Sequence, residues 1–168
     1  MNLALGDYRF DLTFQSLVLG LLRCDRKSDS EILQECESLL DSGADCVVLD
    51  YRNFNKNDLQ LASAQVNQIS DSIHELYDVP VLLLDENLKP EEIFNVEYVI
   101  TSNMLLDDNR IGEFDSAWSV SELVANQTKQ ITAGCRILST DSNLAKSSRR
   151  TADLMSAILR SEQVESQT

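Results

Sequence analysis

Proline, glycine and long apolar runs are all scarce in this sequence of 168 residues. The composition, with two prolines, five glycines and 43% apolar residues, excludes a collagen-like chain and a wholly disordered acidic chain. No apolar run approaches the roughly 18 residues that a membrane-spanning helix needs. The first 14 residues lack the basic segment and the continuous apolar core of a signal peptide, so we expect a cytoplasmic protein.

Histidine is scarce, and no cysteines occur at the close spacing that is typical of metal sites. His74 is the only histidine and no two cysteines have the C-x-x-C spacing, so the sequence predicts no metal site. A Cys/His pair for nucleophilic catalysis is an alternative, but reduced, half-buried thiols are the simpler interpretation. The cysteines are Cys24, Cys36, Cys46 and Cys135.

Basic residues are outnumbered, because 14 Lys and Arg stand against 28 Asp and Glu and leave a net charge of −14. This charge repels polyanions, so we expect neither a nucleic acid nor an anionic membrane surface as a partner. The length fits one domain, which we place at residues 1–160, followed by a disordered tail at residues 161–168.

Short apolar runs alternate with helical patterns along the chain. Continuous apolar runs are typical of strands covered on both faces, and they lie at residues 16–22, 46–49, 81–84, 98–100 and 136–138. Amphipathic helices are expected at residues 28–42, 57–77, 120–133 and 144–160, with a short helix from about residue 89. The alternation predicts an α/β fold with a parallel sheet of about five strands.

The helical patterns also predict which side chains face the sheet. Ser28 and Glu31 fit a capping box at the start of the first helix. His74 is expected at the surface. The inward-facing stripes are expected to include Leu76 on the second helix, Val120 and Val124 on the third, and Ile158 on the last.

Polar side chains gather where the strands of this sheet are expected to end, which is where such folds bind ligands. They are Arg23, Arg26, Lys27, Asp50, Arg52, Asp85, Asn103 and Asp141. Two interpretations are open: a pocket for a small anion, or a rim of mutually paired charges, which we favour. A third possibility is a small enzyme in which Asp50 and Asp85 form a general acid–base pair.

Several segments resemble, in the right order, the motifs of one enzyme family. They are residues 10–12 (FDL), 17–22 (LVLGLL), 43–49 (GADCVVL), 79–81 (VPV), 89–91 (KPE) and 134–138 (GCRIL). The first two resemble the opening hairpin and first strand of the dihydropteroate synthase family of pterin-binding barrels. The others resemble the starts of its second, third and last strands.

The resemblance implies an incomplete TIM-barrel-like (β/α) sheet with helices outside. The family barrel is longer, and the missing length would fall near residues 101–118. Phe114 and Trp118 follow this point, so we expect them either to plug the open side of the sheet or to form part of a partner surface.

The family enzyme condenses a pterin pyrophosphate with p-aminobenzoate, using Mg²⁺ and basic residues. The resemblance places Arg23 where the family has a metal-holding Asn, and Ser139 and Asp141 where it has the Arg and His that carry the diphosphate. Only the third-strand carboxylate persists, at Asp85 or Glu86, which makes Asp85 the candidate for catalysis. The candidates for ligand binding are Arg23, Asp50, Arg52, Asn103, Ser139 and Asp141.

These departures predict a degenerate dihydropteroate synthase-like domain without synthase activity alone. We expect it to be a structural or regulatory partner, linked to folate biosynthesis, of another protein, of a second copy or of a full-length relative. No cofactor is expected, and Mg²⁺ only if the family activity persists. The alternatives are a small enzyme or a pterin- or anion-binding protein using the strand ends, and a signalling receiver domain. Arg23 and Cys24 stand where a receiver has acidic residues, which argues against the last.

Overall fold

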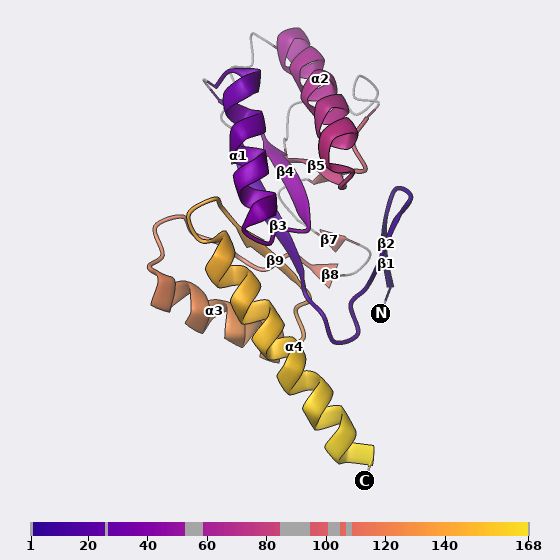
Figure 1. Ribbon diagram of the computed structural model, residues 1–168, viewed down its shortest axis with the longest axis vertical. Helices are drawn as coiled ribbons and strands as arrows, with labels where there is room; N and C mark the ends of the chain where they lie inside the picture. The colour runs from indigo at the N-terminus through magenta and orange to yellow at the C-terminus, as the bar shows by residue number, and fades with distance from the viewer. Residues whose placement is uncertain are drawn as a thin grey trace.

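The structure, a computed structural model, describes residues 2–25, 27–52, 59–84, 95–100, 105–106 and 109–167. Figure 1 shows the order and arrangement of the helices and strands. The strands are β1 (Asn2–Leu5), β2 (Tyr8–Asp11), β3 (Leu17–Arg23), β4 (Cys46–Asp50), β5 (Val81–Leu84), β6 (Tyr98–Ile100), β7 (Leu105–Leu106), β8 (Asn109–Arg110) and β9 (Ile137–Thr140). The helices are α1 (Asp29–Asp41), α2 (Leu59–Tyr77), α3 (Val120–Thr132) and α4 (Ala145–Gln167).

Five parallel strands form the central sheet in the order β6-β5-β4-β3-β9. All five were predicted from the apolar runs, so the α/β class and the number of strands in this sheet are confirmed. The last strand pairs with the first strand of the sheet, Leu17 lying opposite Ile137, as in a barrel that brings its two ends together. The architecture is therefore a partial TIM-barrel-like (β/α) sheet.

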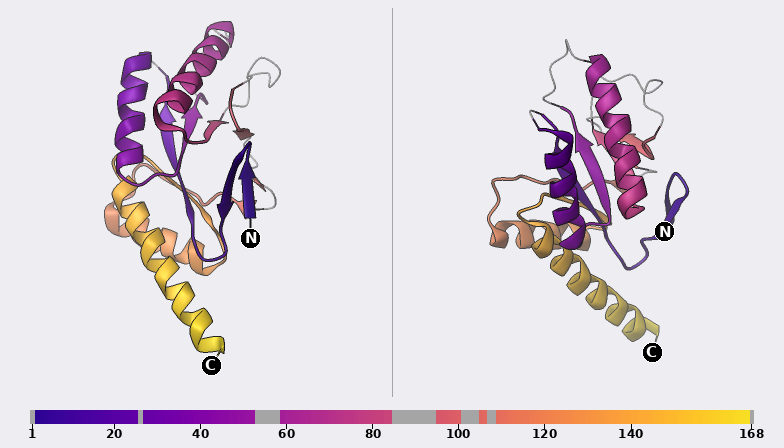
Figure 2. Two further views of the ribbon diagram at one scale, coloured as in Figure 1. Left: turned by 45° about the vertical axis from the view of Figure 1, so that its right-hand side comes forward. Right: turned by 45° about the horizontal axis from the view of Figure 1, so that its top comes forward.

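The two faces of the sheet are covered by different elements, because side chains alternate along each strand. On the outer face, Val18, Val47 and Leu83 pack with apolar residues of the helices. On the inner face, Leu19 and Val48 pack with Leu3 and Leu5 of the β1–β2 hairpin and with Leu12 after it. Figure 2 shows the hairpin and the helices on opposite sides of the sheet. The hairpin implied by residues 10–12 is thus present, and it covers the inner face.

The first βαβ unit shows how local sequence signals build this packing. Ser28 accepts a hydrogen bond from Glu31 N and the Glu31 carboxylate accepts one from Ser28 N, which confirms the predicted capping box. The helix ends before Gly43, whose φ of +110° suits a residue without a Cβ atom. At Gly20, a Cβ atom would lie 2.9 Å from a Leu39 methyl group, so glycine allows α1 to approach the sheet closely.

The outer edge of β9 is partly covered by the segment that precedes α3. Ile111 forms a parallel bridge with Ile137, and Gly112 N donates to Ile137 O at 2.8 Å. Gln127 Nε2 donates to Ser139 O at 2.8 Å and so satisfies a second carbonyl on this edge. These contacts remove part of the unpaired edge that an incomplete barrel would leave.

Phe114 and Trp118 pack edge to face, with ring centroids 5.9 Å apart and an interplanar angle of 81°. Both rings are half-buried. They lie in the chain between the strand-edge segment and α3, and they contact each other. Whether they also serve a partner stays a prediction.

Four side chains expected to face inward are exposed: Leu76, Val120, Val124 and Ile158. On α2, Tyr77 is one turn beyond the buried Ile73 and packs on the core in place of Leu76. Helix α3 buries only a narrow stripe, Leu123, Gln127 and Ile131, which excludes its valines.

The last helix also differs from its expected length. Helix α4 continues to Gln167, through most of the segment for which a disordered tail was expected. No glycine or proline interrupts residues 161–167, and Glu and Gln favour helix, so the helix is not stopped at Arg160. Among the described helices, none is long and apolar enough to cross a membrane.

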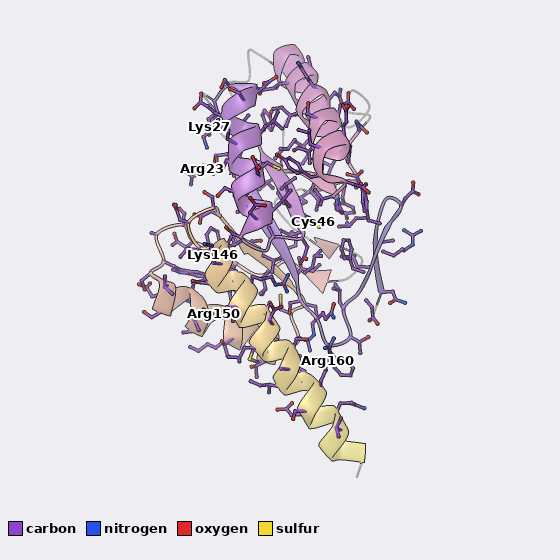
Figure 3. All side chains as sticks on the ribbon, in the orientation of Figure 1. Arg23, Lys27, Cys46, Lys146, Arg150 and Arg160 are labelled. Atoms are coloured by element: carbon purple, nitrogen blue, oxygen red, sulfur yellow. The ribbon has the colours of Figure 1, made fainter. Side chains whose placement is uncertain are left out.

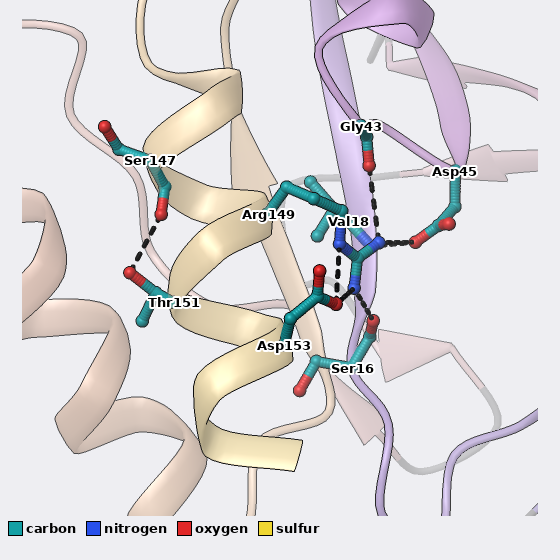
Figure 4. Close-up of polar contacts among 8 residues, drawn as sticks. All are labelled: Ser16, Val18, Gly43, Asp45, Ser147, Arg149, Thr151 and Asp153. Carbon is teal, nitrogen blue, oxygen red and sulfur yellow. Dashed lines mark hydrogen bonds and ion pairs between the residues drawn. The ribbon is translucent and has the colours of Figure 1, made fainter. Parts of the chain in front are cut away.

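Arg149 of α4 connects the last helix to the first βαβ unit (Figure 4). Its guanidinium donates to the Asp45 carboxylate at 2.9 Å and to the carbonyl oxygens of Gly43 and Ser16 at 3.3 Å. The same Asp45 oxygen accepts a hydrogen bond from Val18 N at 2.9 Å. One half-buried ion pair thus joins α4, the α1–β4 connection and the start of β3.

Replacing this arginine tests its role in stability. We expect Arg149→Ala to lower the free energy of unfolding by about 2–3 kcal/mol, because several charge-assisted hydrogen bonds are lost together. Urea unfolding followed by circular dichroism measures the change. Asp153→Ala is the control: it removes only an exposed ion pair with Arg149 (3.1 Å) and should cost less than about 1 kcal/mol. Equal losses in the two variants would contradict this role.

Candidate functional site

The predicted rim lies at the carboxyl ends of β3, β4 and β9. In the strand register, Arg23 of β3 lies opposite Asp50 of β4, and Ser139 of β9 lies opposite Leu19 of β3. All three follow the inner-face alternation of their strands. Asp85 and Asn103, like Arg26, lie outside the described residues, so the proposed acid–base pair with Asp50 stays a prediction.

Asp50 is held by its neighbour Arg52. The Asp50 residue is only 6% exposed, and its two carboxylate oxygens accept from Arg52 Nε at 3.0 Å and Nη2 at 2.9 Å. Arg52 N also donates to Oδ1 at 3.1 Å. This bidentate arrangement neutralises the buried carboxylate and fixes the chain at the end of β4. The preferred sequence interpretation, a rim of paired charges, is the one seen at this pair.

Asp141 caps the turn at residues 141–144 that leads into the last helix. Its Oδ1 atom accepts hydrogen bonds from Asn143 N and Leu144 N, both at 3.0 Å. Both amides belong to the turn that precedes Ala145, the first residue of α4, and the carboxylate holds this turn in place, so it has a structural role. Ser139, two residues earlier, is buried, and its carbonyl oxygen receives the Gln127 bond described above.

Lys27 also has a partner at this end of the sheet. Its Nζ atom lies 2.7 Å from Glu35 Oε2, and the other oxygen of Glu35 accepts from the Ser142 hydroxyl at 3.2 Å. The β3–α1 connection, helix α1 and the β9–α4 connection are therefore linked to one another. In the part of the chain that the structure describes, Arg23 alone of the predicted rim cations is exposed with no acidic partner (Figure 3).

A partly buried series of hydrogen bonds behind the rim was not predicted. The Tyr51 hydroxyl donates to Gln65 Oε1 at 2.9 Å, and Gln65 Nε2 donates to Asp29 Oδ1 at 3.0 Å. Burial, reinforced by the adjacent Cys24, raises the pKa of Tyr51 far above its usual range, so the phenol stays protonated. These hydrogen bonds connect α1 and α2 to the end of β4. Sequence patterns give no signal for them, because the bonded residues are far apart in the chain.

None of the four cysteines, all of which lie in the described residues, forms a disulfide bond. Burial raises the pKa of Cys24 and Cys36 to about 12, and it also raises the pKa of Cys46 and Cys135. At neutral pH they are therefore poor nucleophiles. These shifts favour the interpretation of the cysteines as reduced structural residues.

His74 lies in a polar depression at the amino ends of the strands, far from the predicted rim in the fold. Its Nε2 atom is 2.7 Å from Glu97 Oε1, although the direction is poor for a hydrogen bond. The residue was expected at the surface, whereas in the structure its ring is half-buried. The depression has a volume of about 450 Å³ and includes Tyr8, Asp71 and Asp78. Burial and the hydrogen bond to Asp78 raise the pKa of Tyr8 to about 12.

Most groups in this depression are already used within the protein. Glu97 Oε2 accepts from Val81 N at 2.7 Å, and the side chain of Asn95 bonds Asp71. Among the described residues, no three His, Cys, Asp or Glu side chains are placed to hold a metal ion.

No protein-family model matches the sequence, and no curated protein matches it. Solved structures do match its fold. The dihydropteroate synthase of Burkholderia cenocepacia complexed with 7,8-dihydropteroate gives a TM-score of 0.67 at 11% identity, covering 96% of this chain and 98% of that one. The enzyme of Thermus thermophilus gives a TM-score of 0.66 at 14% identity, covering 94% of this chain and 99% of that one. The enzyme of Coxiella burnetii gives a TM-score of 0.62 at 10% identity, covering 95% of this chain and 98% of that one.

The fold is that of the dihydropteroate synthases. The resemblance stated from the sequence is thereby confirmed at the level of fold. At identities of 10–14%, the likeness carries no residue roles across, so the chemistry of the rim depends on this chain's own side chains.

The role of Asp141 as the cap of this turn can be measured. Asp141→Ala should lower the free energy of unfolding by about 1 kcal/mol, because two amides of the turn that leads into α4 lose their side-chain acceptor. Asp141→Asn keeps an acceptor oxygen and should cost only a few tenths of a kcal/mol by the same reasoning. Urea unfolding compares the variants, and an Ala variant as stable as the native protein would show that this cap contributes nothing.

The buried thiols predict how stability depends on pH. Above pH 9 the unfolded chain releases thiol protons that the native state retains until about pH 12, so the free energy of unfolding should fall as the pH rises through this window. Each such thiol contributes a slope of up to about 1.4 kcal/mol per pH unit. Cys36→Ala should therefore show a shallower fall than the native protein. An unchanged slope in that variant would rule out this thiol as a source of the effect.

Proposed function

We propose that this chain is a dihydropteroate synthase-like domain without synthase activity of its own, which acts as a structural or regulatory partner in the cytoplasm. The observation that carries the proposal is the engagement of the rim groups in contacts within the chain. Both oxygens of Asp50 are bonded by Arg52, and Asp141 caps the turn before α4. We also propose a link to folate biosynthesis, and the likeness of the fold to dihydropteroate synthases is what supports it.

The described rim residues do not fit the magnesium ion that the fold family implies. Mg²⁺ is bound by oxygen ligands in near-octahedral geometry. Arg23 brings a guanidinium group to the strand end, and the Asp50 carboxylate is occupied by a second guanidinium. Departure of a diphosphate needs positive charge focused on the leaving group, whereas Asp141 adds a negative charge nearby. The described rim residues therefore form no magnesium site.

Charge and cysteine chemistry support the kind of partner proposed. A net charge of −14 disfavours nucleic acid and anionic membrane surfaces, so among macromolecules we propose a protein as the partner. Four reduced cysteines are typical of a reducing compartment, which supports the cytoplasm.

A second candidate function is the binding of a small anion, favoured by one observation. Arg23 is exposed at the rim and has no acidic partner among the described residues. A pterin or another small anion bound there would use this cation without any catalysis.

Calorimetry with a pterin pyrophosphate, with and without Mg²⁺, separates these functions. The proposal expects no micromolar binding and no product from p-aminobenzoate. Magnesium-dependent binding with turnover would overturn it. Magnesium-independent binding that Arg23→Gln abolishes would favour the second candidate, provided that Arg9→Gln, an exposed arginine on the β1–β2 hairpin, binds as the native protein does.

A further inference from the structure

Helices α1 and α2 lie side by side on the outer face of the sheet (Figure 1). They run in the same direction, because each leads from one parallel strand to the next. Gln65 of α2 donates to Asp29 of α1 at 3.0 Å, so these residues mark the flanks that face each other. Eleven residues make about three helical turns, so Leu40 and Leu76, each eleven positions further along, return to the same flanks.

Apolar side chains are present along these two flanks. Leu76 is 63% exposed, and Leu33 and Leu40 are half-buried at the edge of the core. Tyr77 is also half-buried, and burial, followed by the nearby Glu37, raises its pKa, which places the phenol beside α1. We call Leu33, Leu40, Leu76 and Tyr77 the α1–α2 face. The exposed leucine is therefore part of a larger apolar surface.

The charge around the α1–α2 face has one sign. The two helices contain seven Asp and Glu residues and no Lys or Arg, whereas the whole chain has 14 basic residues for its 28 acidic ones. An apolar surface surrounded by negative charge is complementary to a partner with the opposite charge. The seven residues are Asp29, Glu31, Glu35, Glu37, Asp41, Asp71 and Glu75.

Three of these carboxylates are placed unfavourably for the helices that carry them. Glu37 and Asp41 are four residues apart and repel each other across one turn. Asp41 and Glu75 lie in the last turns of α1 and α2, where the helix dipole favours cations. All three are exposed, and among the described residues none of them forms an ion pair. A cation supplied from outside would stabilise this end of both helices.

We propose that the α1–α2 face binds a basic amphipathic helix of a partner protein. Lysine or arginine side chains of that helix lie beside Glu37, Asp41 and Glu75, and its apolar stripe packs on Leu76 and the half-buried leucines. This inference rests on the proposed function, and deepens it by naming the surface and the chemistry of the partner. A second copy of this chain is a poor occupant, because two copies with a net charge of −14 repel each other.

A helix suits this surface because Leu33 and Leu40 are seven residues apart, about two helical turns. An apolar stripe that repeats at the same interval on a partner helix can follow α1 along its length. The charges speed the encounter and fix the orientation, and the apolar contacts slow dissociation. Binding should therefore weaken as the salt concentration rises.

Fluorescence anisotropy with a synthetic peptide tests the apolar part of this face. The probe is a short, fluorescein-labelled peptide in which leucines recur every three or four residues among lysines, and it should bind the full chain saturably. The same peptide with Glu in place of each Lys should not bind. Leu76→Ser should weaken binding about tenfold. Leu154→Ser, at an equally exposed leucine on α4, is the matched control and should bind as the native protein does.

A charge reversal tests the electrostatic part. Asp41→Lys should weaken binding of the basic peptide about tenfold. The same variant should resist urea better than the native protein, because it removes the repulsion from Glu37 and places a cation at the end of α1. Glu162→Lys, at an exposed residue of α4, makes the same change in net charge and should leave the affinity unchanged. Lower affinity in a more stable variant cannot be a consequence of unfolding.

A native protein that does not bind the basic peptide overturns the inference. Equal losses of affinity in Asp41→Lys and Glu162→Lys, or in Leu76→Ser and Leu154→Ser, also overturn it, because the peptide would then respond to net charge or to exposed leucines in general. Spermine that binds as tightly as the peptide would assign the surface to a small polycation instead.

These outcomes are distinguishable from a failure of the proposed function. Absence of peptide binding leaves the absence of synthase activity as calorimetry and product formation find it. Turnover in those assays would overturn the proposed function whatever the peptide does.

Discussion

The ion pair between Arg149 and Asp45 is the contact on which the arrangement of the sheet most depends. An incomplete barrel has to hold its last strand beside its first without a full ring of neighbours. Here β9 pairs with β3, and α4, which follows β9, reaches back to the carboxylate that also binds Val18 N at the start of β3. A short-range electrostatic contact thereby fixes elements more than 100 residues apart in the chain. Because both groups are half-buried, the pair is less screened than a surface salt bridge.

Polar groups at the carboxyl ends of the strands are likewise bonded within the protein. In an enzyme with this architecture, these ends present side chains to a substrate. In this protein Asp50 is bonded to Arg52, Lys27 to Glu35 and Asp141 to the turn before α4. Each bond stabilises a connection between a strand and a helix, and each occupies a group that a ligand would otherwise use. In the function that we propose, structural use of the rim and loss of the family reaction are two consequences of the same contacts.

The fold could be predicted from the sequence further than the site could. Continuous apolar runs identified every strand of the central sheet, because a strand buried on both faces admits few polar residues. The buried faces of the helices were harder to predict. Val120 and Val124 of α3 are exposed because that helix buries only a narrow stripe. On α4, Leu159 packs on the core and its neighbour Ile158 is exposed. At the rim, the positions of Arg23, Asp50 and Ser139 could be predicted from where the strands end, but their hydrogen-bond partners could not. The hydrogen bonds that Arg52 donates and that Asp141 accepts join residues close in the chain, so local sequence could have predicted them. The hydrogen bonds of Arg149 and Gln65 join distant segments, and no local sequence pattern indicates them.

The most direct measurement of the central claim is a crystal structure after soaking with a pterin pyrophosphate and Mg²⁺. If the rim serves the fold, Arg52 will remain on both oxygens of Asp50, Asp141 will still cap the turn before α4, and no diphosphate will be bound at the strand ends. A diphosphate seated among Arg23, Arg52 and Ser139, with a magnesium ion coordinated beside it, would contradict the account.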